Sequence, residues 1–233
     1  MRNHLLTLLL SCLISASSLA AAAPVKDDWG MWLSNTYQTD FGGSNYLAFL
    51  ELAPRTKHDN GEFSQIIVRP LLGYKLTQKL QLWLGYTWQG EYSKDTDFDL
   101  ATNDFMQQLQ WIDNWTPQLN FQYRFRFEER FFENEDTAYR MRHRFRFVYS
   151  LPATKAYLIA ADELFVYFNS INHGRLATAV QSGINQNRSY VGIGYKITPK
   201  INIDTGYQFQ FVNNFSAPDG ANHIWLTNIN VNF

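Results

Sequence analysis

Two neighbouring segments of the chain carry arginine at nearly every second position, and the residues between these arginines are mostly aromatic or apolar. The arginines are Arg124, Arg126 and Arg130 in the first segment and Arg140, Arg142, Arg144 and Arg146 in the second. Guanidinium groups bind carboxylates and phosphates through two parallel hydrogen bonds. A cluster of this kind therefore points to recognition of an anion.

The alternation predicts two β-strands, because successive side chains leave a strand on opposite faces. One face would carry the arginines. The other would carry Phe125, Phe127, Phe145 and Phe147. The wall of a membrane barrel turns its apolar face to lipid and its polar face to water, whereas a soluble sheet buries its apolar face against a core. The strong contrast between the two faces favours the barrel wall.

A hairpin centred near residues 134–136 predicts which side chains lie opposite one another. The expected pairs are Arg124 with Arg146, Arg126 with Arg144, Glu128 with Arg142, and Arg130 with Arg140. Like charges directly opposite on one face are destabilising. We therefore expect carboxylates, water or an anion between these arginines.

Short turns at Pro117 and Pro152 would bring further polar residues to this face. The first would place Gln108 and Gln110 beside Arg126 and Arg124, and the second would bring Glu163 or its neighbour Asp162 beside Arg142. The predicted lumen lining is Arg69, Arg124, Arg126, Arg130, Arg140, Arg142, Arg144, Arg146 and Arg188, with Glu128, Asp162, Glu163 and Asp204 as ion-pair partners. Arginines outnumber carboxylates in this set, which predicts a positive wall and a small anionic solute. The alternative is a hydrated ion-pair lattice that only stiffens the wall.

The first 22 residues have the pattern of a cleaved secretory signal peptide. Arg2 precedes an apolar run, and Ala20–Ala22 provide a small-residue cleavage site. The single cysteine, Cys12, lies in this segment, so the mature chain would have no disulfide and no thiol nucleophile. We expect export, with residues 23–233 forming one domain.

The mature chain shows eleven segments with strand-like alternation and no apolar run of about 20 residues that would predict a transmembrane helix. Short turns such as 77–79 and 198–200 alternate with longer connections such as 93–104 and 169–184. This asymmetry is typical of outer-membrane barrels, in which both termini lie in the periplasm and the strand number is even. We expect an all-β, antiparallel barrel of ten to twelve strands, with twelve preferred. The additional strand would lie in 169–184, which could equally form an external helical turn.

Other classes of function find little support in the sequence. The formal net charge of -1 argues against a nucleic-acid-binding protein. His58, His173 and His223 are scattered without metal-ligand spacing, and no phosphate-binding loop is present. His143 falls on the predicted lipid-facing side, as an interfacial residue. We expect no catalytic site, no cofactor and no metal site.

Trp83 differs from the other tryptophans because the alternation of its strand places its side chain on the inward face. Most tryptophan and tyrosine residues fit the aromatic belts at the two membrane interfaces. A tryptophan in the lumen could pack against neighbours or serve as a platform for a sugar ring. Packing is the preferred interpretation.

The chain ends with apolar residues at alternate positions, Ile229, Val231 and the terminal Phe233. This ending is similar to the signal that the bacterial outer-membrane assembly machinery recognises. We therefore expect Phe233 to engage that machinery and the mature barrel to lie in outer-membrane lipid. Together with the signal peptide, this predicts location in the bacterial outer membrane.

Trp29, the segment 162–165, the segment 187–192 and the pair Gly206-Tyr207 resemble a bacterial family of predicted outer-membrane barrels, domain of unknown function 2490. The resemblance covers essentially the whole mature chain and implies location and fold but no activity. In architecture and arginine content the chain is also similar, more faintly, to small oligogalacturonate-type porins, which are narrow barrels with arginine-lined lumens.

The leading hypothesis is a narrow outer-membrane channel for small anionic solutes, acidic oligosaccharides among them. The alternative is a closed structural or adhesion barrel whose external loops bind partners. A third hypothesis is an outer-membrane lipid-modifying enzyme that uses a histidine such as His143.

Overall fold

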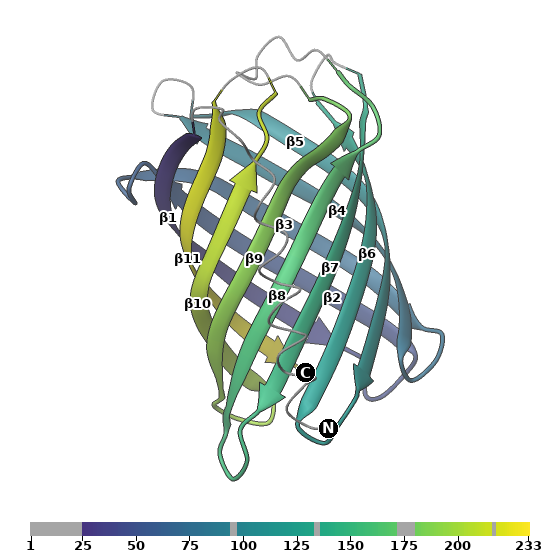
Figure 1. Cartoon of the computed structure of the whole chain (residues 1–233). Coiled ribbons are helices and arrows are strands. Elements are labelled where there is room, and N and C mark those ends of the chain that lie inside the picture. Colours follow the sequence, from purple (N-terminus) through teal and green to yellow (C-terminus); the bar gives the residue numbers. More distant parts are fainter. Residues whose placement is uncertain (1–24, 94–96, 133–135, 172–179, 216–217) are drawn as a thin grey trace, which may run out of the picture.

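The computed structural model describes residues 25–93, 97–132, 136–171, 180–215 and 218–233. These residues form a single closed barrel of eleven strands (Figure 1). The strands are β1 (Val25–Thr39), β2 (Tyr46–Lys57), β3 (Glu62–Lys75), β4 (Leu80–Ser93), β5 (Asp97–Asn114), β6 (Leu119–Phe131), β7 (Ala138–Ser150), β8 (Ala156–Tyr167), β9 (Gly183–Lys196), β10 (Ile201–Val212) and β11 (Asp219–Asn232). The predicted all-β barrel is therefore confirmed. In this part of the chain no helix is long and apolar enough to span a membrane.

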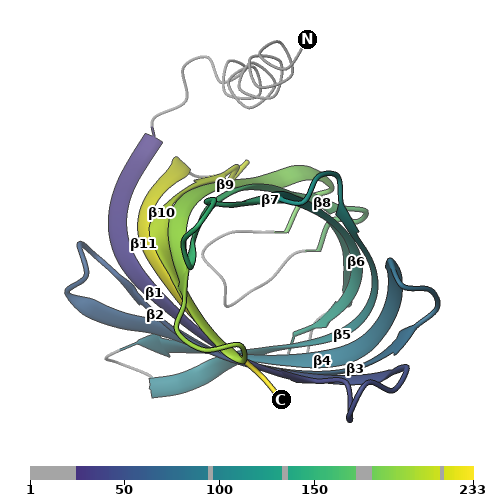
Figure 2. The same ribbon diagram turned by 90° about the horizontal axis from the view of Figure 1, so that it is seen from below.

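The barrel closes through a parallel pair of strands. Each strand pairs antiparallel with its neighbour in sequence, and β1 then pairs with β11, so that the strands enclose a lumen (Figure 2). Trp29 lies opposite His223 and Tyr37 opposite Val231, which makes this pair parallel. In an up-and-down barrel with an odd number of strands, the first and last strands run in the same direction. The preferred count of twelve and the wholly antiparallel sheet are not found among the described residues.

The two ends of the barrel differ. The turn end carries the connection 40–45 and the shorter connections at 76–79, 115–118, 151–155 and 197–200. The last residue, Phe233, also lies there, and its backbone N donates to the carbonyl oxygen of Gln38 (2.9 Å). The loop end carries the other connections, and β1 begins there because Val25 lies opposite Asp219. Of the predicted features, the signal peptide at 1–22 lies outside the described residues.

Two connections at the loop end differ from expectation. The predicted loop 93–104 is largely a strand, since β5 begins at Asp97 and pairs with β4 as far as Ser93. The inward-facing positions of this strand continue from Met106 toward the N-terminus through the buried Asp104 and Thr102. In the 169–184 segment, Ile171 and Val180 pair in an isolated antiparallel bridge. Residues 172–179 lie outside the described part, so the choice between an extra strand and a helical turn stays open.

The outer face of the barrel is apolar and exposed. Leu72, Leu84, Val191 and Ile193 are each more than half exposed, and aromatic side chains lie near both ends of the strands. Trp115 stacks on Phe121 near the turn end. At the loop end Trp29 stacks on His223. The outside of the barrel therefore carries an apolar band with aromatic side chains near both of its edges.

The inner face combines polar rows with small apolar clusters. One cluster consists of Leu47, Leu71, Trp83 and Met106, with Phe49 packed against it. Trp83 points inward and is 4% exposed, which agrees with the packing interpretation. Gly73 makes room for it, because a Cβ there would lie 2.5 Å from Trp83 Cε3.

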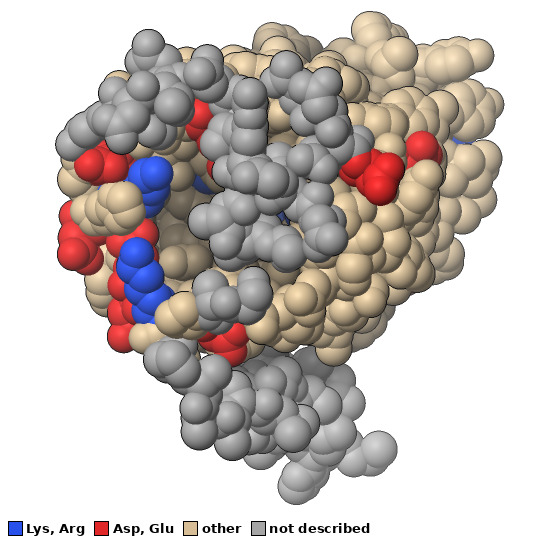
Figure 3. All heavy atoms as spheres, turned by 90° about the horizontal axis from the view of Figure 1, so that it is seen from above, with Lys and Arg blue, Asp and Glu red and all other residues tan. Residues whose placement is uncertain are grey.

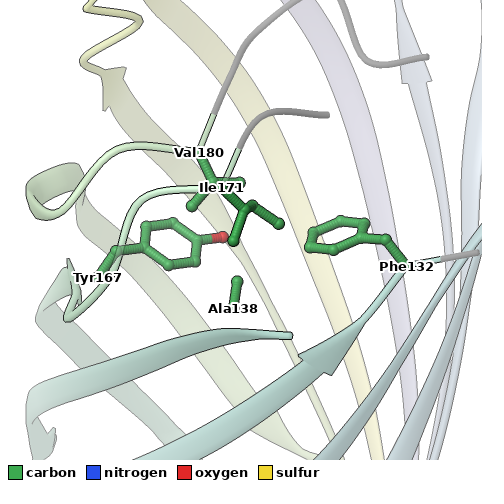
Figure 4. Packing of buried hydrophobic residues seen from close by; sticks show 5 residues of the cluster. All are labelled: Phe132, Ala138, Tyr167, Ile171 and Val180. Carbon is green, nitrogen blue, oxygen red and sulfur yellow. The ribbon is translucent and has the colours of Figure 1, made fainter. Parts of the chain in front are cut away.

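A second inner cluster lies at the loop end. It consists of Phe132, Ala138, Tyr167, Ile171 and Val180 (Figure 4). Phe132 and Tyr167 point toward one another from opposite sides, with Ile171 and Val180 near both. The cluster thereby packs the bridge of the β8–β9 connection against the inner wall of the barrel.

Candidate functional site

The lumen contains two main cavities. The loop-end chamber has a volume of about 250 Å³ and includes Asp104, Arg130 and Gln186 in its lining. The turn-end chamber has a volume of about 440 Å³ and includes Gln110, Gln122 and Arg146. A more open hollow at the turn end also touches Gln122 and Arg146, so the second chamber continues toward that mouth. The two chambers and this hollow therefore follow one another along the inside of the barrel.

Five residues line both chambers and form the partition between them. They are Trp32, Arg55, Arg69, Arg142 and Arg188. Three of these arginines were among the predicted lumen residues. The boundary between the two chambers is therefore made chiefly of guanidinium groups around one indole.

Cation–π contacts hold the partition together. The guanidinium carbon of Arg55 lies 3.7 Å from the Trp32 ring centroid, and that of Arg188 lies 4.9 Å from it. Arg188 and Arg142 also lie over the Phe165 ring, at 4.7 Å and 4.4 Å. Such contacts hold the cation without neutralising it. Arg55 and Arg188 therefore keep their charge, whereas Arg69 is paired with Glu51 and Arg142 with Glu128 and Glu163.

The structure places all nine predicted arginines on the walls of the two chambers. Arg130 and Arg140 line the loop-end chamber, and Arg69, Arg142 and Arg188 line both. The remaining four, Arg124, Arg126, Arg144 and Arg146, line the turn-end chamber. Seen from above, both basic and acidic side chains are visible around the mouth of the barrel (Figure 3).

The register of the arginine hairpin differs from the prediction by two residues. The observed pairs are Arg124 with Arg144, Arg126 with Arg142, Glu128 with Arg140, Arg130 with Ala138, and Gln122 with Arg146. The observed register places Ala138 rather than an arginine opposite Arg130, which removes one like-charge pair. It also places Glu128 between two arginines of β7. The predicted neighbours across the β5–β6 turn, Gln108 with Arg126 and Gln110 with Arg124, are confirmed.

Glu128 is the centre of the buried ion-pair network. It is fully buried, and its Oε2 accepts from Arg140 Nε (2.6 Å) while its Oε1 accepts from Arg142 Nη1 (2.8 Å). Arg126 Nη1 lies 3.8 Å from the same Oε1. One carboxylate therefore compensates more than one cation.

Glu163 and Asp104 extend this network in opposite directions. Glu163 Oε1 accepts from Arg142 Nε (3.0 Å) and from Arg124 Nη2 (2.6 Å). In the register Glu163 lies opposite Arg144 rather than the expected Arg142. Asp104 Oδ1 accepts from Arg130 Nε (2.8 Å) nearer the loop end.

Two predicted ion-pair partners do not fill that role. Asp162 lies on the outer face, because it alternates with the inward Glu163, and it accepts from Ser189 Oγ (2.7 Å) and Asn187 Nδ2 (3.0 Å). Asp204 points inward but lies on β10, away from the arginines of β6 and β7. Its carboxylate accepts from Asn228 Nδ2 (2.6 Å) and Tyr190 Oη (3.3 Å). Neither forms an ion pair with an arginine among the described residues.

Sequence reasoning missed four residues of the lumen. Arg55 belongs to β2, which continues through Pro54 to Lys57, and the alternation Ala53, Arg55 was the available signal. Glu51 forms an ion pair with Arg69 across β2 and β3. Trp32 and Asp104 likewise follow the inward phase of their strands. Both could have been found by extending the alternation by a few residues.

Several guanidinium donors remain without an acceptor. Among the described residues, the buried atoms Arg55 Nε, Arg124 Nε, Arg126 Nη1 and Arg144 Nε have no hydrogen-bond partner, and neither does Gln208 Nε2. The carboxylates that line the chambers are Asp28, Asp104, Glu51, Glu163 and Asp204, against ten arginines. Even with the buried Glu128 added, the walls of the described lumen carry more cations than anions.

The histidines lie away from this network. His143 is on the outer face as predicted, and its Nδ1 lies 2.7 Å from Tyr123 Oη. His223 is also outside, and its Nδ1 lies 2.6 Å from Tyr207 Oη. Within the part of the chain that the structure describes, no three His, Cys, Asp or Glu side chains are grouped as metal ligands.

The fold and its interior define a closed β-barrel with an arginine-lined lumen. The family model "Protein of unknown function (DUF2490)" matches residues 29–221, and the chain belongs to this family, as its motifs predicted. An uncharacterized protein of Methylorubrum extorquens is 28% identical over 237 residues, which cover 100% of both chains. A solved structure titled "NanC porin structure in rhombohedral crystal form" matches with a TM-score of 0.46 and 14% identity, over 78% of this chain and 87% of that one.

Proposed function

We propose that this protein is a narrow outer-membrane channel that favours small anionic solutes. The observation that carries the proposal is the excess of lumen-facing arginines, several of which have buried donors without an acceptor. A solute with carboxylate or phosphate groups would complete these hydrogen bonds. A cation would meet the same walls without any compensating acceptors.

The outer face supports a membrane location. Exposed aliphatic side chains cover the middle of the barrel, and a surface of this kind would promote aggregation of a soluble protein. In lipid the same surface is solvated, and a closed barrel leaves no backbone edge unpaired. The signal peptide and the terminal Phe233 fit export and insertion by the outer-membrane assembly machinery. The proposed surroundings are therefore outer-membrane lipid, with no nucleic acid partner and no catalytic activity.

The arginines supply selectivity through charge and through geometry. Arg144 and Arg188 form no ion pair with a carboxylate of the described chain, so their charge is available to a solute. Guanidinium groups remain protonated at physiological pH, and their field attracts anions into a confined, low-dielectric lumen. Narrow width strengthens this effect, since a small anion cannot pass the partition without approaching several guanidinium groups.

The partition also favours a second candidate, a closed structural barrel with partner-binding loops. Trp32, Arg55 and Arg188 separate the two chambers in this conformation. If these side chains do not move, solutes cannot cross. The two candidates differ in whether any solute passes.

Solute release from vesicles tests the channel directly. Proteoliposomes preloaded with radiolabelled lactate, a small carboxylate, are expected to release it faster than matched vesicles release choline, a small organic cation. Protein-free vesicles provide the control for leakage. Release of neither solute would support the closed barrel, and faster release of choline would contradict the arginine-based selectivity.

A further inference from the structure

We propose that Arg124, Arg126 and Arg144 form a fixed binding site for one oxoanion on the wall of the turn-end chamber. The ligand is a carboxylate or phosphate group of a small molecule. The inference deepens the proposed function and rests on it only for the route by which the anion enters. The binding itself follows from the local geometry.

The three arginines come from one patch of the inner wall. Arg124 on β6 lies directly opposite Arg144 on β7, and Arg126 is the next inward residue along β6. All three line the turn-end chamber. The three arginines therefore occupy neighbouring positions on one side of a cavity of about 440 Å³.

Two of the three side chains are oriented by neighbours. Arg126 donates through Nε and Nη2 to Gln108 Oε1, at 2.9 Å and 2.6 Å. Arg124 donates through Nη2 to Glu163 Oε1. Two hydrogen bonds therefore orient the Arg126 guanidinium group, and one orients that of Arg124. Such pre-organisation lowers the entropy cost of binding an anion.

The donors that remain have no acceptor. Arg124 Nε, Arg126 Nη1 and Arg144 Nε are buried without a hydrogen-bond partner, and Arg126 is only 2% exposed. A buried donor without a partner is destabilising. Their clustering on one patch means that a single ligand could satisfy all of them.

The nearby carboxylates are already engaged. Glu128 binds Arg140 and Arg142, and its distance of 3.8 Å from Arg126 Nη1 exceeds a hydrogen bond. Glu163 divides its Oε1 between Arg124 and Arg142. The acceptor must therefore come from outside this network. A planar carboxylate or a tetrahedral phosphate offers several oxygens in the geometry that guanidinium donors match.

Direct binding measurements test the site. The folded protein in detergent is titrated with inorganic phosphate and with acetate against a chloride background, by calorimetry. We expect saturable binding of at least one of the two probes to one site per chain. The response to each probe separates a phosphate site from a carboxylate site.

Variants localise the binding. Arg144→Gln is expected to weaken it about ten-fold or more, because a charged hydrogen-bond donor is lost. Arg144→Lys keeps the charge and the fold, yet should also bind more weakly, since an ammonium group does not reproduce the guanidinium fork. Lys57→Gln removes one charge from the loop-end chamber, outside the turn-end chamber, and serves as the control, with little expected change.

The outcomes separate this inference from the proposed function. Equal weakening by Lys57→Gln and Arg144→Gln would show a diffuse field and overturn the site, as would the absence of saturable binding. Anion-selective transport without such binding would support the proposed channel and reject the proposed binding site. Saturable binding lost in Arg144→Lys, in a barrel that transports nothing, would support the site and reject the channel.

Discussion

Replacing Glu128 with glutamine is expected to destabilise the barrel by about 3–5 kcal/mol. The carboxylate is fully buried and is the shared partner of Arg140 and Arg142. A glutamine has nearly the same volume, but its amide carries no charge and only one acceptor oxygen. The buried guanidinium groups would then face one another without compensation. Urea unfolding of the protein in lipid vesicles, followed by tryptophan fluorescence, measures the change.

The adjacent residue provides a matched control. Glu129 lies on the outer face, where its Oε1 accepts from Gln107 Nε2 (3.1 Å) and no arginine of the described residues forms an ion pair with it. Glu129→Gln makes the same chemical change at the next position and should alter the free energy of unfolding by less than about 1 kcal/mol. If Glu128→Gln were as mild as Glu129→Gln, the network around Glu128 would not be what holds the arginine wall together.

Trp32→Ala is expected to raise the conductance of single channels about two-fold or more, because the partition then loses its central ring. Arg55 and Arg188 stack on that ring, so both would gain freedom when it is removed. The two chambers would join into one path. Recording from single barrels in planar bilayers before and after the substitution gives the ratio directly.

Trp111→Ala is the control for this second effect. Trp111 is 40% exposed on the outer face and lines neither chamber. Its removal should leave the conductance unchanged. An unchanged conductance in Trp32→Ala would place the limiting constriction elsewhere, for instance at the loop-end cluster of Phe132, Ala138, Tyr167, Ile171 and Val180.

The faces of the strands could be predicted from the sequence, whereas the pairing of the arginines could not. Side-chain alternation has a period of two, so it assigns Arg124 to the lumen and Phe125 to the outside whatever the register. A slip of two residues keeps every side chain on its face but changes every partner across the hairpin. That is how Arg124 came to be predicted opposite Arg146 and is found opposite Arg144.

The partition lay beyond sequence reasoning for a different reason. Trp32 and Arg55 lie opposite each other across the β1–β2 hairpin, but only closure of the barrel brings Arg188 of β9 to them. That closure depends on the parallel pairing of β1 with β11. With an even number of strands, the first and last strands would run antiparallel to each other, and β1 would have had different neighbours. Asp162 shows a different limit. Alternation allows only one of Asp162 and Glu163 to face the lumen, and the sequence left open which of the two does so.

The reversal potential of the wild-type barrel in a KCl gradient tests the central claim most directly. With ten arginines on the walls of the two chambers, the described lumen should pass chloride in preference to potassium, and the sign of the potential should show this. Arg144→Gln should move the potential toward zero. A potential of the opposite sign, or one that Arg144→Gln leaves unchanged, would contradict an anion-selective lumen.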